Sequence, residues 1–129
     1  MRSEVRVDDL NDPISHYTDA VRFGDLLFVS GCGPVDSNLN LIGEDDVAAQ
    51  TRQVLTNMEK VLSAAGATFA DVLKVVVYLT DVDDREKINP VRTEFFGQSR
   101  PASTLIGVQA LAIPGMKVEI DAVVGIPND

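Results

Sequence analysis

The sequence contains only one cysteine and one histidine. A single cysteine excludes an intramolecular disulfide, and a lone thiol is typical of a protein from a reducing compartment. One histidine and one cysteine also fall short of a recognisable zinc site, and neither a P-loop nor the glycine pattern of dinucleotide-binding proteins is present. We therefore expect no metal and no cofactor.

Basic residues are also scarce. The chain has 11 lysines and arginines against 20 acidic residues, which gives a formal net charge of -9. A protein this acidic is not drawn to phosphate backbones or anionic lipids, so we expect neither a nucleic-acid partner nor a membrane. No apolar run approaches membrane-spanning length, and no apolar signal segment follows the first residues. These features predict a cytoplasmic protein.

The 129 residues correspond to one ordinary domain, and we assign residues 1–129 to a single unit. Apolar runs and turn residues alternate throughout, without a repeat or a linker. Two short apolar runs, 20–23 and 26–30, flank Gly24-Asp25, which is typical of a β-hairpin. Further strands are predicted at 72–79, 102–108 and 116–124.

Two helices are predicted. Apolar residues recur at steps of three and four from Val47 to Ala65, Asp46 is suited to cap the first turn, and Gly66 is suited to end the helix. A second helix is expected between about residues 84 and 96, and Pro90 within it predicts a kink or a late start.

The predicted order is strand, strand, helix, strand, helix, strand, strand, which indicates an α+β fold: a mixed sheet with both helices on one face. Residues 72–79 are apolar on both sides of their strand, and no further element is left to cover the second face. A second copy of the chain is therefore expected there. The alternative is that the N-terminal segment folds over this face.

Several short motifs extend from Tyr17 to Val124. They include Tyr-Thr-Asp-Ala-Val at 17–21, Leu-Phe-Val-Ser-Gly at 27–31, Ala-Ala-Gly at 64–66, Phe-Phe-Gly at 95–97, Arg-Pro-Ala-Ser-Thr at 100–104 and Val-Glu-Ile-Asp-Ala at 118–122. As a set they resemble the Rid family (YjgF/YER057c/UK114), whose best-known members hydrolyse reactive imines and enamines to ketones and ammonia.

The resemblance implies a chorismate-mutase-like fold of the Bacillus type. It implies a homotrimer in which three clefts between neighbouring subunits bind a small metabolite without a cofactor. It also implies that Tyr17, Ser30, Asn89 and Glu119 line the cleft. In the best-known members the residue after Pro-Ala is an arginine that holds the substrate carboxylate, and here that residue is Ser103.

Glu119 is the candidate catalytic residue. Alternation along the predicted strand places Glu119 and Asp121 on the face opposite Val118 and Ile120. A general base at Glu119 would orient and deprotonate the water that attacks a C=N carbon. From the residues alone, a solvated strand face also explains both carboxylates. The resemblance assigns the catalytic role to Glu119, while Asp121 is still expected to be structural.

The other candidates would bind substrate. Tyr17 and Ser30 offer hydroxyl groups, although packing and turn formation also explain them. Asn89 would support a loop beside the cleft, and His16 stands either at the cleft mouth or on the surface. Cys32 is expected to be a pocket-lining or buried thiol, because no base that would activate it can be recognised.

Ser103 leaves two functions open. A serine offers one neutral donor where an arginine offers two charge-assisted hydrogen bonds, which predicts about ten- to a hundredfold weaker binding of 2-imino acids. Arg100 is the alternative source of a cation. The chain is then either an imine or enamine hydrolase with a shifted substrate choice, or a metabolite-binding module without deaminase activity. A ribonuclease is the weakest interpretation because of the net charge.

Overall fold

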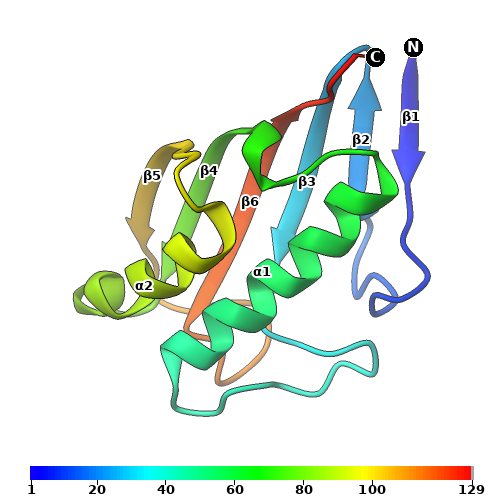
Figure 1. Ribbon diagram of the computed structural model, residues 1–129. Coiled ribbons are helices and arrows are strands. Elements are labelled where there is room, and N and C mark those ends of the chain that lie inside the picture. Colours follow the sequence, from blue (N-terminus) through cyan, green and yellow to red (C-terminus); the bar gives the residue numbers. More distant parts are fainter. Residues whose placement is uncertain (129) are drawn as a thin grey trace.

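The computed structural model describes residues 1–128, which form one sheet with two helices on one of its faces (Figure 1). The α-helices are α1 (Val47–Ala64) and α2 (Arg85–Phe96). Two short 3₁₀ helices, η1 (Phe69–Asp71) and η2 (Val82–Asp84), precede β4 and α2. The strands are β1 (Arg2–Val5), β2 (Ala20–Phe23), β3 (Leu26–Cys32), β4 (Val72–Leu79), β5 (Ala102–Gly107) and β6 (Val118–Gly125).

The strand order in the sheet is β1-β2-β3-β6-β4-β5. Every neighbouring pair is antiparallel except β4 and β5, which are parallel because α2 carries the chain back between them. The predicted α+β fold, with a mixed sheet and both helices on one face, is confirmed. β1 was not predicted, because its sequence Arg-Ser-Glu-Val has one apolar side chain and the strand only extends the edge of the hairpin.

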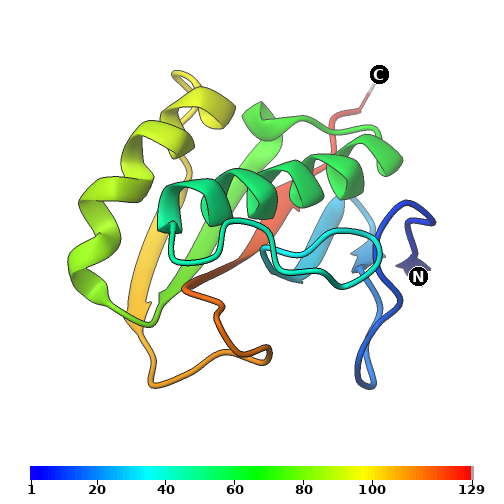
Figure 2. The ribbon, with the colours of Figure 1, turned by 90° about the horizontal axis from the view of Figure 1, so that it is seen from below.

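Helix α1 starts and ends as the sequence predicts. The carboxylate of Asp46 accepts a hydrogen bond from the backbone N–H of Ala49 at 3.0 Å, and Gly66 follows the helix with φ of +75°. Figures 1 and 2 show α1 lying across β3 and β6. Its inward stripe includes Val47, Val54, Leu55, Met58, Val61 and Leu62, which are 0–5% exposed and form the centre of the core.

Helix α2 spans Arg85–Phe96, as predicted for about residues 84–96. It begins before Pro90, so the late start, one of the two alternatives that Pro90 suggested, is wrong. The chain enters α2 directly from η2, and the helix continues through Pro90 to a C-terminal cap at Gly97, where φ is +58°. Ile88 and Val91 are buried on its inner side. Figure 2 shows α2 beside α1 on the same side of the sheet.

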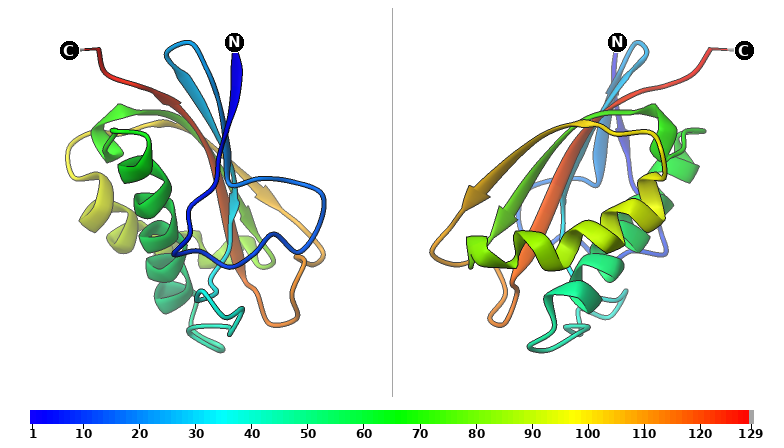
Figure 3. Two further views of the ribbon diagram at one scale, coloured as in Figure 1. Left: turned by 90° about the vertical axis from the view of Figure 1, so that its right-hand side faces the viewer. Right: turned by 60° about the vertical axis from the view of Figure 1, so that its left-hand side comes forward.

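No element of residues 1–128 covers the second face of the sheet (Figure 3). Phe28, Leu73 and Ile106 remain 47%, 52% and 41% exposed. The alternative in which the N-terminal segment covers this face is therefore wrong. Part of that segment packs on the helix side, where Asp9 forms an ion pair with Lys60 of α1 at 3.1 Å.

Strand β4 is less apolar on this open face than the sequence suggested. Val75, Val77 and Leu79 point into the core, while the other side alternates Lys74, Val76 and Tyr78. The open face therefore combines apolar and polar groups. None of the helices in residues 1–128 has the length and apolar character needed to span a membrane.

Candidate functional site

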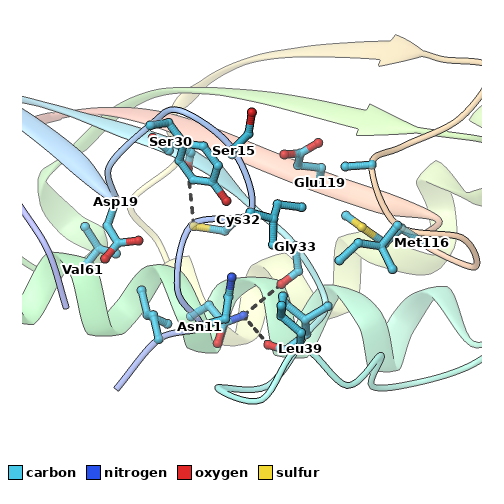
Figure 4. Close-up of a pocket in the computed structure, with 18 residues that line it drawn as sticks. Asn11, Ser15, Asp19, Ser30, Cys32, Gly33, Leu39, Val61, Met116 and Glu119 are labelled. Atoms are coloured by element: carbon cyan, nitrogen blue, oxygen red, sulfur yellow. Dashed lines mark hydrogen bonds between the residues drawn. The ribbon is translucent and has the colours of Figure 1, made fainter. Parts of the chain in front are cut away.

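A cavity of about 410 Å³ lies at the end of the sheet where β3 ends and β6 begins (Figure 4). Its walls come from residues 10–19, the end of β3, α1 and the loop that leads into β6. Four of the residues predicted to bind or convert a substrate line it: Tyr17, Ser30, Cys32 and Glu119. The fold thus brings together residues from opposite ends of the chain.

A bulge in β3 lets Glu119 reach this cavity. The pairing register between β3 and β6 shifts between Val29 and Cys32, and Gly31 lies within the shift. The Glu119 carboxyl packs directly against the Cα of Gly31: a Cβ atom there would lie 2.8 Å from the Cδ of Glu119. Only glycine permits this close approach.

The environment of Glu119 disfavours its charged form. Its carboxyl is partly buried and shares the open face with Asp121. Burial raises the pKa of Glu119, and the charge of Asp121 raises it further. Asp121 itself accepts a hydrogen bond from the Tyr78 hydroxyl at 2.9 Å. A carboxyl whose pKa is raised is better matched to proton transfer near neutral pH than an ordinary surface glutamate.

Asp19 fastens the segment that forms one wall of the cavity. Its carboxylate accepts a hydrogen bond from the backbone N–H of Val7 at 2.8 Å and pairs with the guanidinium of Arg6 at 2.6 Å. The Ser30 hydroxyl donates to the carbonyl of Thr18 at 2.6 Å, which ties β3 to the same segment. Because its proton is engaged, Ser30 has only acceptor capacity left for a ligand.

Cys32 is a buried thiol. It is 9% exposed, and its Sγ donates a weak hydrogen bond to the carbonyl of Ser30 at 3.6 Å. Burial, with smaller effects from the charges of Asp19 and Glu119, raises the pKa of Cys32 to about 12. The thiol stays protonated at neutral pH, so Cys32 lacks the thiolate that a nucleophile requires.

Buried amide side chains of α1 hold the loops around the cavity. Asn57 donates to the carbonyl of Gly33 at 2.9 Å. Gln50 donates to the carbonyl of Gly115 at 2.9 Å and accepts from the backbone N–H of Lys117 at 2.7 Å. Neither amide was predicted from the sequence, since apolar periodicity does not identify a buried polar residue whose partners lie far along the chain.

The other three predicted residues do not line this cavity. His16 is exposed, next to Tyr17. Asn89 lines a second cavity, of about 280 Å³, between α2 and the start of β5, and Arg100 lines it as well. Ser103, the first residue after Ala102 in β5, accepts a hydrogen bond from Arg92 of α2 at 3.1 Å.

Ser103 and Glu119 lie on opposite faces of the sheet. Ser103 pairs in register with Val75, whose side chain is in the core on the helix side. Glu119 pairs with Tyr78 on the open face. The two cavities share no lining residue.

The first cavity has the groups for proton transfer to a small polar molecule: one carboxyl with a raised pKa and the oxygens of Tyr17 and Ser30. Within residues 1–128, no three side chains of the histidine, cysteine, aspartate or glutamate type converge in a way that would hold a metal ion.

A six-stranded mixed sheet with both helices on one face and a cavity at the end of its central strands defines an α+β protein of the chorismate-mutase-like type. A family model described as Endoribonuclease L-PSP matches residues 9–126. The chain belongs to the Rid family (YjgF/YER057c/UK114), as its motifs predicted.

Its relatives include proteins with named activities. A RutC family protein of Pyrococcus horikoshii is 38% identical over 95% of this chain and 97% of that protein. The 3-aminoacrylate deaminase RutC of Acinetobacter baylyi is 36% identical over 86% of this chain and 87% of its own length. A 2-iminobutanoate/2-iminopropanoate deaminase of Dermatophagoides farinae is 33% identical over 88% of both proteins.

Solved structures confirm the fold. The Rid-family protein YyfA of Yersinia pestis has a TM-score of 0.91 at 29% identity and covers 98% of this chain and 100% of that one. RidA from an Antarctic Psychrobacter has a TM-score of 0.89 at 30% identity and covers 96% and 99% of the two chains.

Proposed function

We propose that this chain is a hydrolase of small imine- or enamine-type metabolites. The observation that carries the proposal is Glu119, a partly buried carboxyl with a raised pKa in a cavity with the oxygens of Tyr17 and Ser30. The names of two relatives support the substrate class, since one is a deaminase of 3-aminoacrylate and the other a deaminase of 2-iminobutanoate.

In the proposed reaction, water adds to the carbon of the C=N bond while the carboxylate of Glu119 accepts a proton from that water. The nitrogen of the carbinolamine is then protonated by the carboxyl group that Glu119 has become. The carboxylate of Glu119 then takes the proton of the hydroxyl and passes it to the same nitrogen as the C–N bond breaks, so that ammonia leaves and the oxygen becomes the ketone oxygen. One imine and one water thus give one ketone and one ammonia, with no oxidant or reductant.

The proposal includes a homotrimer with clefts between subunits. Glu119 faces one side of the sheet whereas Ser103 and Asn89 belong to the other, so one chain does not bring these residues to a common substrate. The exposed apolar side chains of the open face support its burial against another copy. The single cysteine supports a reducing compartment, and we place the protein in the cytoplasm.

A metabolite-binding module without deaminase activity is the second candidate. Ser103 favours it, because a serine stands where deaminases of this family carry the arginine that holds a carboxylate. Binding of nucleic acid is disfavoured by the net charge of -9, in spite of the description of the matching family model.

Ammonia release from freshly generated imines tests the two candidates. The wild type and the Glu119→Gln variant would be assayed with a carboxylated 2-imino acid and with an uncharged imine. We expect turnover of at least one imine by the wild type and its loss in the variant. A wild type that is silent on both imines, but binds the corresponding ketones, would favour the binding module.

A further inference from the structure

The second cavity contains two arginines. It measures about 280 Å³ and lies between α2 and the residues that lead into β5. Arg92 and Arg100 line it together with Asn89 and the aromatic ring of Phe96. Among residues 1–128, the ion pairs include neither Arg92 nor Arg100.

The guanidinium of Arg92 has unused donors. Its Nη2 donates to the Oγ of Ser103 at 3.1 Å. A guanidinium has five N–H donors in a planar fork, and one bond to a hydroxyl leaves the fork able to take a carboxylate. Burial lowers the pKa of Arg92, as expected for a cation that is partly desolvated.

Three of the other five arginines differ in this respect, while Arg22 and Arg85 donate to backbone carbonyls. Arg2, Arg6 and Arg52 each pair with a carboxylate within 3.2 Å. Acidic residues outnumber basic ones by 20 to 11, so carboxylates are plentiful. The C-terminal carbonyls of α2 carry only about half a negative charge in total, which two guanidinium groups exceed. The second cavity is therefore positive in an otherwise acidic protein.

We propose that Arg92 and Arg100 bind the carboxylate of a small metabolite, with Ser103 orienting the guanidinium of Arg92. This carboxylate site rests on the proposed function, which supplies the imine as the reacting part of the substrate. The substrate is then a carboxylated imine. The cation that holds its carboxylate comes from α2. Ser103 does not abolish carboxylate recognition but positions a different arginine. On this proposal, 2-imino acids bind more tightly than the loss of an arginine at position 103 alone predicts.

Binding of 2-oxobutanoate, a stable ketone of this substrate class, tests the proposal against its uncharged methyl ester. Calorimetric titration would compare the wild type with Arg92→Gln and with Arg22→Gln, a control that removes one positive charge from β2 at the far side of the sheet. We expect about ten- to a hundredfold weaker binding of 2-oxobutanoate by Arg92→Gln, little change for the ester, and none for Arg22→Gln.

Arg92→Lys keeps the charge but loses the planar fork, so its affinity should fall between those of the wild type and Arg92→Gln. This variant distinguishes loss of carboxylate recognition from misfolding. Thermal unfolding of each variant also reports whether it is folded. Equal affinities of the wild type and Arg92→Gln, or a wild type that does not bind 2-oxobutanoate, would overturn the subsite. Arg92-dependent binding without ammonia release from any imine would uphold the subsite and overturn only the hydrolase.

Discussion

The two cavities of this protein carry opposite charges. The cavity at the end of β3 and β6 holds Glu119 and Asp19, while the one between α2 and β5 holds Arg92 and Arg100. The first lies beside β3 and β6 and the second beside β5 at the edge of the sheet, and they share no lining residue. The carboxylates of the first cavity thus disfavour an anionic ligand beside the catalytic candidate Glu119. The arginines of the second cavity favour an anionic ligand, but that cavity contains no catalytic candidate.

This separation shows that neither cavity is a complete site for a carboxylated imine. A substrate would need its C=N carbon near Glu119 and its carboxylate near Arg92, which two copies of the chain would supply from opposite sides. The open face, with Phe28 and Leu73 exposed, is the surface through which the copies would meet.

Glu119→Gln should lower turnover by about 10²- to 10⁴-fold, since the amide removes the general base while it keeps the size of the side chain. The measurement is ammonia release under single-turnover conditions. Asp121→Asn is the matched control, because it changes the neighbouring carboxylate that is bonded to Tyr78. A fall of similar size in both variants would assign the effect to the charge of the face rather than to Glu119.

Asp19→Ala should destabilise the protein by about 1–3 kcal/mol, because it leaves the Val7 N–H and the Arg6 guanidinium without their shared acceptor. Asp12→Ala is the matched control. Asp12 also pairs with Arg6 but is fully exposed, so its loss should leave the denaturation midpoint unchanged. Ammonia release should weaken in Asp19→Ala while 2-oxobutanoate affinity is retained, and loss of both would mean that Asp19 also supports the second cavity.

The sequence predicted the core better than the edges. Helix α1 was predictable because its apolar stripe, its Asp46 cap and Gly66 all agree. β1 was not, because an edge strand needs little apolar content. The predicted span of α2 was right, and only the late start suggested by Pro90 was wrong, since the chain enters the helix directly from η2.

For the site, alternation along β6 was enough to place Glu119 and Asp121 on one face, and the family motif singled out Glu119. Asp19, Gln50 and Arg92 were missed. Their partners lie 12, 67 and 11 residues away in the sequence, and such pairings are fixed by the fold and not by a local pattern.

Mixed trimers test whether the two cavities combine across subunits. Equal amounts of Glu119→Gln and Arg92→Gln chains would be unfolded and refolded together. If each cleft takes Glu119 from one copy and Arg92 from another, about one quarter of the clefts would contain both intact residues. Ammonia release should then recover to about that fraction of the wild-type rate. A rate no higher than that of the separate variants would mean that the two residues do not share a site.

The smallest effect concerns stability and pH. The raised pKa of Glu119 means that the folded state binds more protons than the unfolded state between the ordinary value of 4.5 and the raised one. The free energy of unfolding therefore falls as pH rises through this window. The Glu119→Gln variant lacks this decrease in the free energy of unfolding. Its stability relative to the wild type should therefore be greater at pH 7 than at pH 4. Arg92→Gln should show no such pH dependence, because Arg92 stays protonated throughout. Urea denaturation at both pH values measures this difference in the free energy of unfolding. If the relative stability of Glu119→Gln did not change with pH, the carboxyl of Glu119 would be as well solvated in the first cavity as in the unfolded chain.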